Sequence, residues 1–131
     1  MELYHSSEAD CMTVRDLLRK HNAPHMEDYR TFCYHIKEDD AIIGGIVAEA
    51  VSDTVEISYL FVEESHRNKG YGRALLQQVE QDARRHHMKR ILLNTYSFQA
   101  PYFYPKMGYT ELFSIDPCFG EHSQHFYTKA L

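Results

Sequence analysis

The chain has 131 residues, of which 44% are hydrophobic and 25% are charged, and its formal net charge is -5. This length fits one compact domain, and the composition is ordinary for a soluble globular protein. We therefore expect residues 1–131 to form a single domain. No apolar run reaches the roughly 18 residues of a membrane-spanning helix, and the N-terminus lacks a signal-peptide core, which predicts a cytoplasmic protein with no membrane partner. An acidic chain without a basic run argues against nucleic acid as a partner.

The three cysteines and nine histidines predict neither a disulfide nor a metal site. Cys11, Cys33 and Cys118 are odd in number and widely spaced, so we expect reduced thiols. His86 and His87 are adjacent on a predicted helix and point in different directions. No HExxH-like spacing supplies three converging ligands, so we expect no metal.

The N-terminal half predicts a helix followed by three strands. Residues 1–5 are a candidate strand, and Ser7 with Asp10 three residues later is typical of a helix start. The apolar residues of this helix recur at helical spacing, at Cys11, Val14, Leu17 and Leu18. Asn22-Ala23-Pro24 ends the helix.

Strand candidates follow at residues 29–37, 41–51 and 55–62, separated by short polar turns that indicate an antiparallel meander. Gly44-Gly45 interrupts the second strand and suggests a bulge or bend. In the third strand, strict alternation places Val55, Ile57, Tyr59 and Phe61 on one face and Glu56, Ser58, Leu60 and Val62 on the other.

The C-terminal half predicts a parallel crossover. A helix at residues 71–87 has an expected buried stripe at Ala74, Leu75, Val79 and Ala83, with Gln78, Gln81, Asp82 and Arg85 facing water. The apolar strand at residues 90–96 should lie parallel to residues 55–62. A short helix at residues 99–107 and strands at 109–115 and 125–129 complete the chain. We expect an α+β, three-layer fold with a mostly antiparallel sheet of six or seven strands and helices on both faces.

The residues between the third strand and the long helix indicate a pyrophosphate site. Gly70 and Gly72 let the backbone approach a ligand closely at the start of a helix, where N–H groups are unpaired and the dipole is positive. Arg67, Lys69 and Arg73 add charge. A plain glycine turn before an amphipathic helix is the alternative. The dinucleotide fingerprint needs a third glycine where this chain has Leu75, and no GxxxxGK[ST] loop occurs.

Three spaced motifs resemble the GNAT superfamily of N-acetyltransferases. Arg67-x-x-Gly70-x-Gly72 is similar to the acetyl-CoA signature [Q/R]xxGx[G/A], and Leu60-Phe61-Val62 is similar to the L-x-V strand end that precedes it. Residues 100–109 resemble the A-x-x-x-Y-x-x-x-G-[F/Y] segment. Together the motifs cover residues 55–110.

The resemblance implies a cofactor site and a mechanism. The backbone of Leu60, Phe61 and Val62 would pair with the pantetheine arm of acetyl-CoA, and an N–H there would stabilise the oxyanion. The pyrophosphate would lie on the N–H groups of Asn68, Lys69, Gly70, Tyr71, Gly72 and Arg73. Tyr104 matches the tyrosine that protonates the departing thiolate, with core packing as the alternative.

Glu56 resembles in position the glutamate base of some members, and an exposed strand carboxylate or a base replaced by water is the alternative. Where many members have an asparagine, this chain has Ser97, so the partner of the pantetheine amide is open among Ser97, Asn94 and Thr95. The polar loop at residues 120–125 is a candidate for the acceptor cleft. Homodimerisation is common in this fold and is expected here.

The resemblance implies acetyl transfer from acetyl-CoA to a primary amine of a small molecule, in part because the chain is too short for a separate protein-recognition domain. Protein or peptide N-acetylation is the second hypothesis. A non-catalytic acyl-CoA sensor is the third, and the presence of both Tyr104 and Glu56 argues against it.

Overall fold

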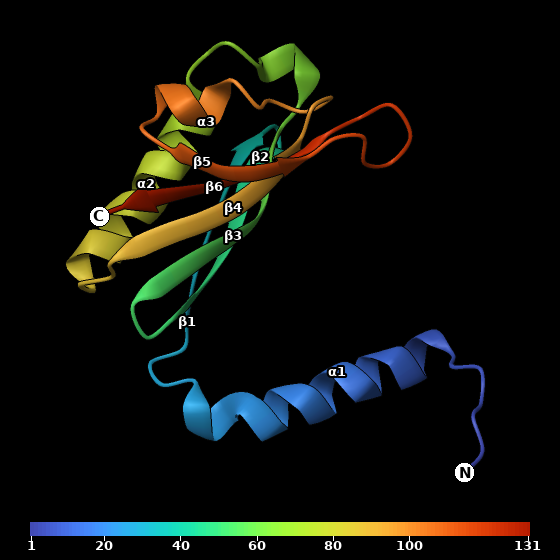
Figure 1. Cartoon of the computed structure of the whole chain (residues 1–131). Helices are drawn as coiled ribbons and strands as arrows, with labels where there is room; N and C mark the ends of the chain where they lie inside the picture. Colours follow the sequence, from blue (N-terminus) through green and yellow to red (C-terminus); the bar gives the residue numbers. More distant parts are fainter.

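Six strands form one mixed sheet in the computed structural model, which describes all 131 residues (Figure 1). The strands are β1 (Arg30–Glu38), β2 (Ala41–Val51), β3 (Thr54–Val62), β4 (Arg90–Tyr96), β5 (Thr110–Ile115) and β6 (Gln124–Ala130). Their order is β1-β2-β3-β4-β6-β5, and only β3 and β4 run parallel. The predicted α+β class with a mixed, mostly antiparallel sheet is confirmed, whereas the helices of this chain cover only one face of the sheet and not both as predicted. Residues 1–5 form no strand, which corrects that expectation.

Helix α2 (Tyr71–Arg85) makes the crossover from β3 to β4 and covers one side of the sheet, which we call the core face. Leu75, Val79 and Ala83 are buried there as predicted, and Leu76 is buried with them. Two predictions for this helix were wrong. Ala74 is exposed, and Asp82 is buried because the Tyr34 hydroxyl and the Gln78 amide donate to its carboxylate.

The last helix, α3 (Phe103–Lys106), lies on the same side as α2 and is shorter than the predicted residues 99–107. Pro101 disfavours helical backbone at the residue before it. Turns occupy this stretch instead, with Gln99 N donating to Tyr96 O at 3.0 Å and Phe103 N to Ala100 O at 3.1 Å.

A bulge in β3 changes which side chains share a face. Ala48 of β2 pairs with Ile57, but the preceding residue Val47 pairs with Tyr59, so Ser58 is an extra residue in β3. Alternation therefore reverses after Ser58. The predicted faces hold only as far as Ile57: beyond the bulge, Leu60 and Val62 pack against the core, whereas Tyr59 and Phe61 are 71% and 56% exposed on the opposite side.

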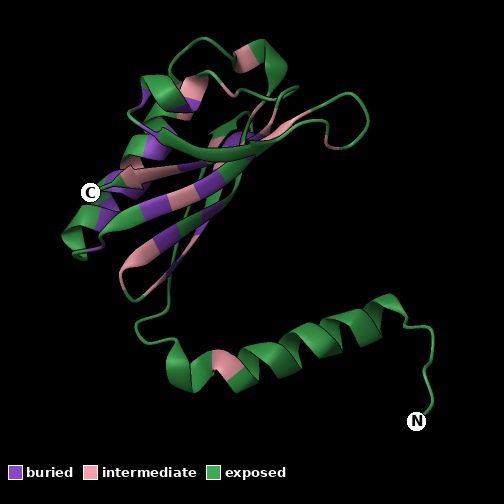
Figure 2. Ribbon diagram, in the orientation of Figure 1, coloured by how far each residue is buried: buried purple, intermediate pink, exposed green.

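Helix α1 (Glu8–Asn22) begins as predicted. The Ser7 hydroxyl accepts from Asp10 N, and the Asp10 carboxylate accepts from Ser7 N, which is a capping box. The helix passes into a 3-10 turn, η1 (Ala23–His25), where the sequence has Pro24. None of its residues is buried, so the predicted apolar stripe packs on neither side of the sheet (Figures 1 and 2). No helix in the structure is both long enough and apolar enough to span a membrane.

With α1 standing clear, the side of the sheet opposite α2 has no helix over it. We call this side the open face. Its exposed or half-buried side chains come from all six strands: Cys33, Val47, Glu49, Glu56, Tyr59, Phe61, Leu92, Asn94, Phe113 and Phe126.

Candidate active site at the splay of two strands

The parallel strands β3 and β4 separate halfway along their length. They pair only from Thr54 with Arg90 to Ile57 with Leu93. Beyond this point, residues 58–62 stay paired with β2 alone, and residues 94–96 stay paired with β6 alone. The edge of residues 58–62 that faces β4 therefore offers unpaired backbone groups to an extended ligand. This edge contains the predicted pantetheine-binding residues Leu60, Phe61 and Val62.

A run of free backbone donors follows the splay at the start of α2. The N–H groups of residues 68–73 donate to no acceptor in the protein, and the first helical bond is Ala74 N to Gly70 O at 3.0 Å. Gly70 is the N-cap and supplies no side-chain cap. Lys69 and Arg73 are exposed beside these donors. Six consecutive free N–H groups at a positive dipole end have the chemistry of an anion site.

Arg67 differs from the other cations of this loop, because its Nε donates to the Val62 carbonyl at 2.9 Å. This bond ties the loop to the end of β3 and so connects the free strand edge with the free N–H run. The role of Arg67 here includes bracing the loop, in addition to its predicted charge.

Gly70 has a backbone conformation that side chains rarely adopt, with φ of +87°. A Cβ built on it would meet nothing within 4 Å, so the space above this residue is open. A Cβ on Gly72 would touch Phe103 Cζ at 3.8 Å and Val62 Cγ2 at 3.9 Å, which are ordinary contacts. We call the free N–H groups of residues 68–73 the cradle. A side chain at Gly70 would enter the space above the cradle, whereas Gly72 has room for alanine.

Tyr104 of α3 is packed in the core, and only 7% of it is exposed. Its ring lies 5.2 Å from Phe103, 5.8 Å from Tyr109 and 5.9 Å from Tyr127. No protein group forms a hydrogen bond with the Tyr104 hydroxyl. Every fully buried side-chain oxygen in the protein does have a hydrogen-bond partner, so the Tyr104 hydroxyl is at least partly accessible to solvent. Burial raises the pKa of Tyr104 to about 12. The phenol is thus protonated at neutral pH and can donate but not accept a proton.

Glu56 projects from the opposite side of the sheet. Its neighbours Val55 and Ile57 are buried on the core face, so Glu56 is exposed on the open face. The structure therefore does not bring Glu56 and Tyr104 together on one face. Glu56 lies on the open face and Tyr104 on the core face, and the gap between β3 and β4 separates them. Glu56 belongs to a cavity of about 150 Å³. The residues lining this cavity are mostly apolar: Glu56, Leu92, Leu93, Asn94, Leu112, Phe113, Phe126 and Tyr127.

Comparison with known proteins identifies the family. The sequence profile of the Acetyltransferase (GNAT) family matches residues 2–109. This chain belongs to the GNAT acetyltransferase family. It is 28% identical, over 79% of its length and 78% of the relative, to acetyltransferase Atu2258 of Agrobacterium fabrum strain C58.

Solved structures agree with this membership of the acetyltransferases. An acetyltransferase from Bacillus cereus ATCC 14579 superposes with a TM-score of 0.83 at 28% identity, covering 100% of this chain and 98% of that one. A second structure, from Bacillus anthracis str. Ames, was solved in complex with acetyl coenzyme A. It has a TM-score of 0.66 at 22% identity, over 77% of this chain and 62% of that one, and so shows the shared fold.

In this acetyltransferase, Ser97 is already engaged with the protein. Its N–H donates to Ser123 O at 2.9 Å, and its hydroxyl accepts from Ser123 N at 3.0 Å, which fastens the loop before β6 to the end of β4. Asn94 Oδ1 accepts from Gln124 Nε2 at 3.2 Å, and Thr95 Oγ1 donates to Gln99. The assignment of Ser97 as a pantetheine partner stays a prediction, with its hydroxyl proton free to donate.

Sequence reasoning missed a hydrogen-bonded group built around His125. Its Nε2 lies 2.8 Å from Ser123 Oγ, and its Nδ1 lies 2.5 Å from Glu111 Oε1. Residues 120–125 were expected near the acceptor cleft only as a polar loop, because the pairing that places Glu111 of β5 beside β6 is not visible in the sequence. No group of three or more His, Cys, Asp or Glu side chains is arranged to hold a metal ion.

Proposed function

We propose that this acetyltransferase moves the acetyl group of acetyl-CoA to a primary amine of a small molecule, with residues 1–131 acting as one domain. The observation that carries the proposal is the continuity of two free backbone surfaces. The unpaired strand edge at residues 58–62 is joined to the unpaired N–H run at residues 68–73 by a short loop, which Arg67 fastens to Val62. One surface suits an extended amide chain, and the other suits a diphosphate.

In this proposal, residues 60–62 hold the pantetheine arm as an added strand and present an N–H to the thioester carbonyl. The N–H groups of residues 68–73 hold the pyrophosphate, and exposed Lys69 and Arg73 neutralise its charge. Arg67 fixes the loop that joins the two surfaces. Ser97 stands at the far end of β4 as a donor toward the arm.

The reaction is direct acyl transfer. The neutral amine attacks the thioester carbon, a C–N bond forms, the C–S bond breaks, and the sulfur leaves as a thiolate. Glu56, or water beside it, takes the proton that the amine loses. Tyr104 faces the departing sulfur as the donor. Its pKa of about 12 lies above that of an ordinary thiol, about 8.5, so complete transfer of the proton to a free thiolate is uphill. Hydrogen bonding to the developing charge is therefore the larger part of its role.

The open-face cavity supports a small amine as the acceptor. A volume of about 150 Å³ holds a short side chain or small molecule, and Glu56 is the carboxylate in its apolar lining. A carboxylate among apolar walls favours a cationic head attached to an apolar body. The same cavity would accept one lysine side chain of a peptide, so the panel used to test the function must include both classes.

The function is tested by following release of free thiol from acetyl-CoA in the presence of single amines. The panel pairs small aromatic and aliphatic amines with a lysine-containing peptide of equal concentration. Faster release with small amines than with the peptide supports the proposal. Turnover with the peptide but with none of the small amines would show that the acceptor is a protein or peptide. Tight binding of acetyl-CoA with no turnover on any amine would refute the enzyme and favour an acyl-CoA sensor.

A further inference from the structure

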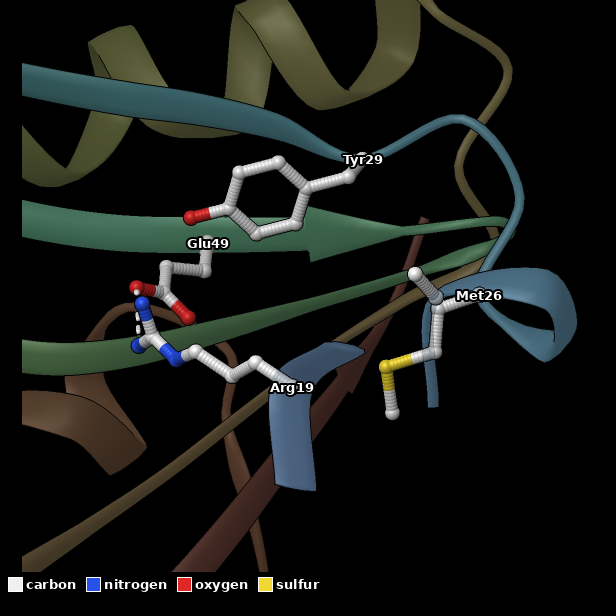
Figure 3. A pocket seen from close by; sticks show the side chains of 5 residues that line it. Arg19, Met26, Tyr29 and Glu49 are labelled. Carbon is white, nitrogen blue, oxygen red and sulfur yellow. Dashed lines mark ion pairs between the residues drawn. The ribbon is translucent and has the colours of Figure 1, made fainter. Parts of the chain in front are cut away.

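The apolar stripe of α1 points away from the sheet of its own chain. At its C-terminal end the helix contacts the sheet through Arg19, whose guanidinium lies 3.6 Å from the Glu49 carboxylate (Figure 3). At 3.6 residues per turn, Val14 and Leu17 lie about 140–160° around the helix from Arg19. Both side chains are 63% exposed, and Leu18 is 58% exposed. The side of the helix that contacts the sheet is therefore its polar side.

Several contacts at the junction between α1 and the sheet fix the orientation of the helix. Glu27 O accepts from Ser52 N at 2.9 Å, which fastens the connecting segment to the turn between β2 and β3. Met26 N donates to Ala23 O at 3.3 Å and closes the turn after α1. A cavity of about 330 Å³ at this junction is lined by Arg19, Ala23, Met26, Tyr29 and Glu49. The helix continues from here into solvent rather than over the open face (Figure 1).

The open face is the second unpartnered apolar surface of the chain. The bulge at Ser58 turns two aromatic side chains onto it, Tyr59 at 71% and Phe61 at 56% exposed. Val47, which pairs with Tyr59, is 40% exposed, and Phe113 is 53% exposed. Soluble monomers rarely expose contiguous apolar patches of more than a few hundred square ångströms. A surface of this kind on a sheet centre is typical of an interface.

We propose that a second copy of this chain occupies the open face, with α1 of each subunit lying across the sheet of the other. One chain carries both an apolar helix stripe and an apolar sheet face, so a two-fold exchange covers all four surfaces and closes the assembly.

The size of these surfaces matches a stable dimer. A fully buried aromatic side chain removes roughly 150–250 Å² from water. Three half-exposed aromatics on each face and the aliphatic stripe of each helix, counted in both subunits, bring the buried area to on the order of 1,200 Å². Specific interfaces bury about 1,200–2,000 Å². The Bacillus cereus acetyltransferase aligns over all of this chain, α1 included, so the helix belongs to the architecture that the two proteins share.

The exchange has a consequence that rests on the proposed function. The cavity containing Glu56 is lined in part by Phe113 and Phe126 of the open face, so a helix laid across this face would cover it. The helix from the second subunit would therefore form the outer wall of the acceptor pocket and shield Glu56 from solvent. The pocket for the amine is then complete only in the dimer, whereas the surfaces for acetyl-CoA lie within one chain.

Sedimentation velocity over a concentration series tests the assembly. The wild-type protein is expected to sediment with twice the mass of one chain. The variant Leu17→Glu/Leu18→Glu is expected to be monomeric and still folded, because no residue of α1 is buried. Met12→Glu is the matched control, since Met12 is 52% exposed on the opposite side of the helix and should leave the dimer intact. A monomeric wild type, or a dimer that survives the Leu17→Glu/Leu18→Glu change, would overturn the proposal.

A mixing experiment tests the exchange itself. Val47→Glu places a charge on the open face and leaves α1 unchanged, so this variant alone is also expected to be monomeric. Mixed with Leu17→Glu/Leu18→Glu, it should form a heterodimer, because an intact helix then meets an intact face. Failure of the mixture to regain dimer mass would exclude helix-to-face exchange and point to helix–helix or face–face contact.

Calorimetric titration of coenzyme A separates this proposal from the function. The monomeric variants should bind coenzyme A as the wild type does and lose turnover on amines. If no form of the protein binds coenzyme A, the proposed function is wrong, whereas the dimer is still tested independently by sedimentation. If the monomers retain full turnover, the partner helix is not part of the acceptor pocket.

Discussion

Replacing Tyr104 by phenylalanine removes one hydroxyl and little else. The ring is 7% exposed and packs against three aromatic neighbours that a phenylalanine would also contact. Its hydroxyl has no protein partner whose hydrogen bond would be lost. We therefore expect the free energy of unfolding to change by no more than about 0.5 kcal/mol. The substitution thus isolates the chemical role of the hydroxyl.

The expected loss of rate follows from the raised pKa. Full general-acid catalysis contributes roughly 10²–10⁴-fold, but a phenol with a pKa of about 12 transfers its proton unfavourably to a thiolate. A hydrogen bond to a charged group contributes about 1.5–3 kcal/mol. At 1.36 kcal/mol per tenfold, this corresponds to a fall in kcat of roughly 10- to 150-fold. Because the pKa is so high, the fall should be the same at every pH between about 6 and 9.

The assay measures initial rates of thiol release from acetyl-CoA for Tyr104→Phe and for Tyr102→Phe. Tyr102 lies two residues away and is 80% exposed, so its phenylalanine variant should keep the wild-type rate. Affinity for coenzyme A should be equal in both variants. An unchanged kcat in Tyr104→Phe would remove this residue from the mechanism. A fall that varies with pH below 9 would show that the phenol ionises there, contrary to the effect of its burial.

Three further predictions concern the base and the core. Glu56→Gln should lower kcat and flatten the alkaline-rising limb of the pH–rate profile; an unmoved profile would assign the proton to water. Glu80→Gln should cost about 3 kcal/mol in urea unfolding, near the low end for a broken buried pair, because buried Glu80 accepts from Lys129 Nζ at 3.0 and 3.1 Å and from the Tyr109 hydroxyl. A loss below about 1 kcal/mol would contradict this view of the pair. The pKa of Tyr104 is raised by burial, so its contribution is present below pH 10 and is lost as the pH rises through about 12. Between these values wild-type stability should fall about 3 kcal/mol more than that of Tyr104→Phe, and equal slopes in the two proteins would contradict it.

Much of the fold could be predicted because its signals are local. The capping residues of α1, the polar turns around β2 and the apolar run of β4 each follow from a few neighbouring residues. The cradle was visible for the same reason, since Gly70 and the basic residues around it are consecutive. What depended on long-range packing was predicted less well. Asp82 is buried beside Tyr34, a residue far away in sequence whose hydroxyl donates to its carboxylate.

The errors in β3 and α1 share a physical cause. Alternation predicts faces only while the pairing register is regular, and the extra residue Ser58 cannot be recognised without the partner strand. The apolar spacing of α1 correctly indicates that the helix has a surface to bury, but it does not say against which chain. The relation of Glu56 to Tyr104 was also hidden, because the side of the sheet on which α3 packs is decided by contacts between residues far apart in the sequence.

The central claim is that free backbone N–H groups at the start of α2 bind the diphosphate of coenzyme A. Isothermal titration of coenzyme A into the wild type and Gly70→Val tests it most directly, since a side chain at Gly70 enters open space above the cradle and strains its φ of +87°. We expect saturable binding to the wild type and at least tenfold weaker binding to the variant, with both proteins folded. Absence of heat with the wild type, or equal affinity in the two, would contradict the account.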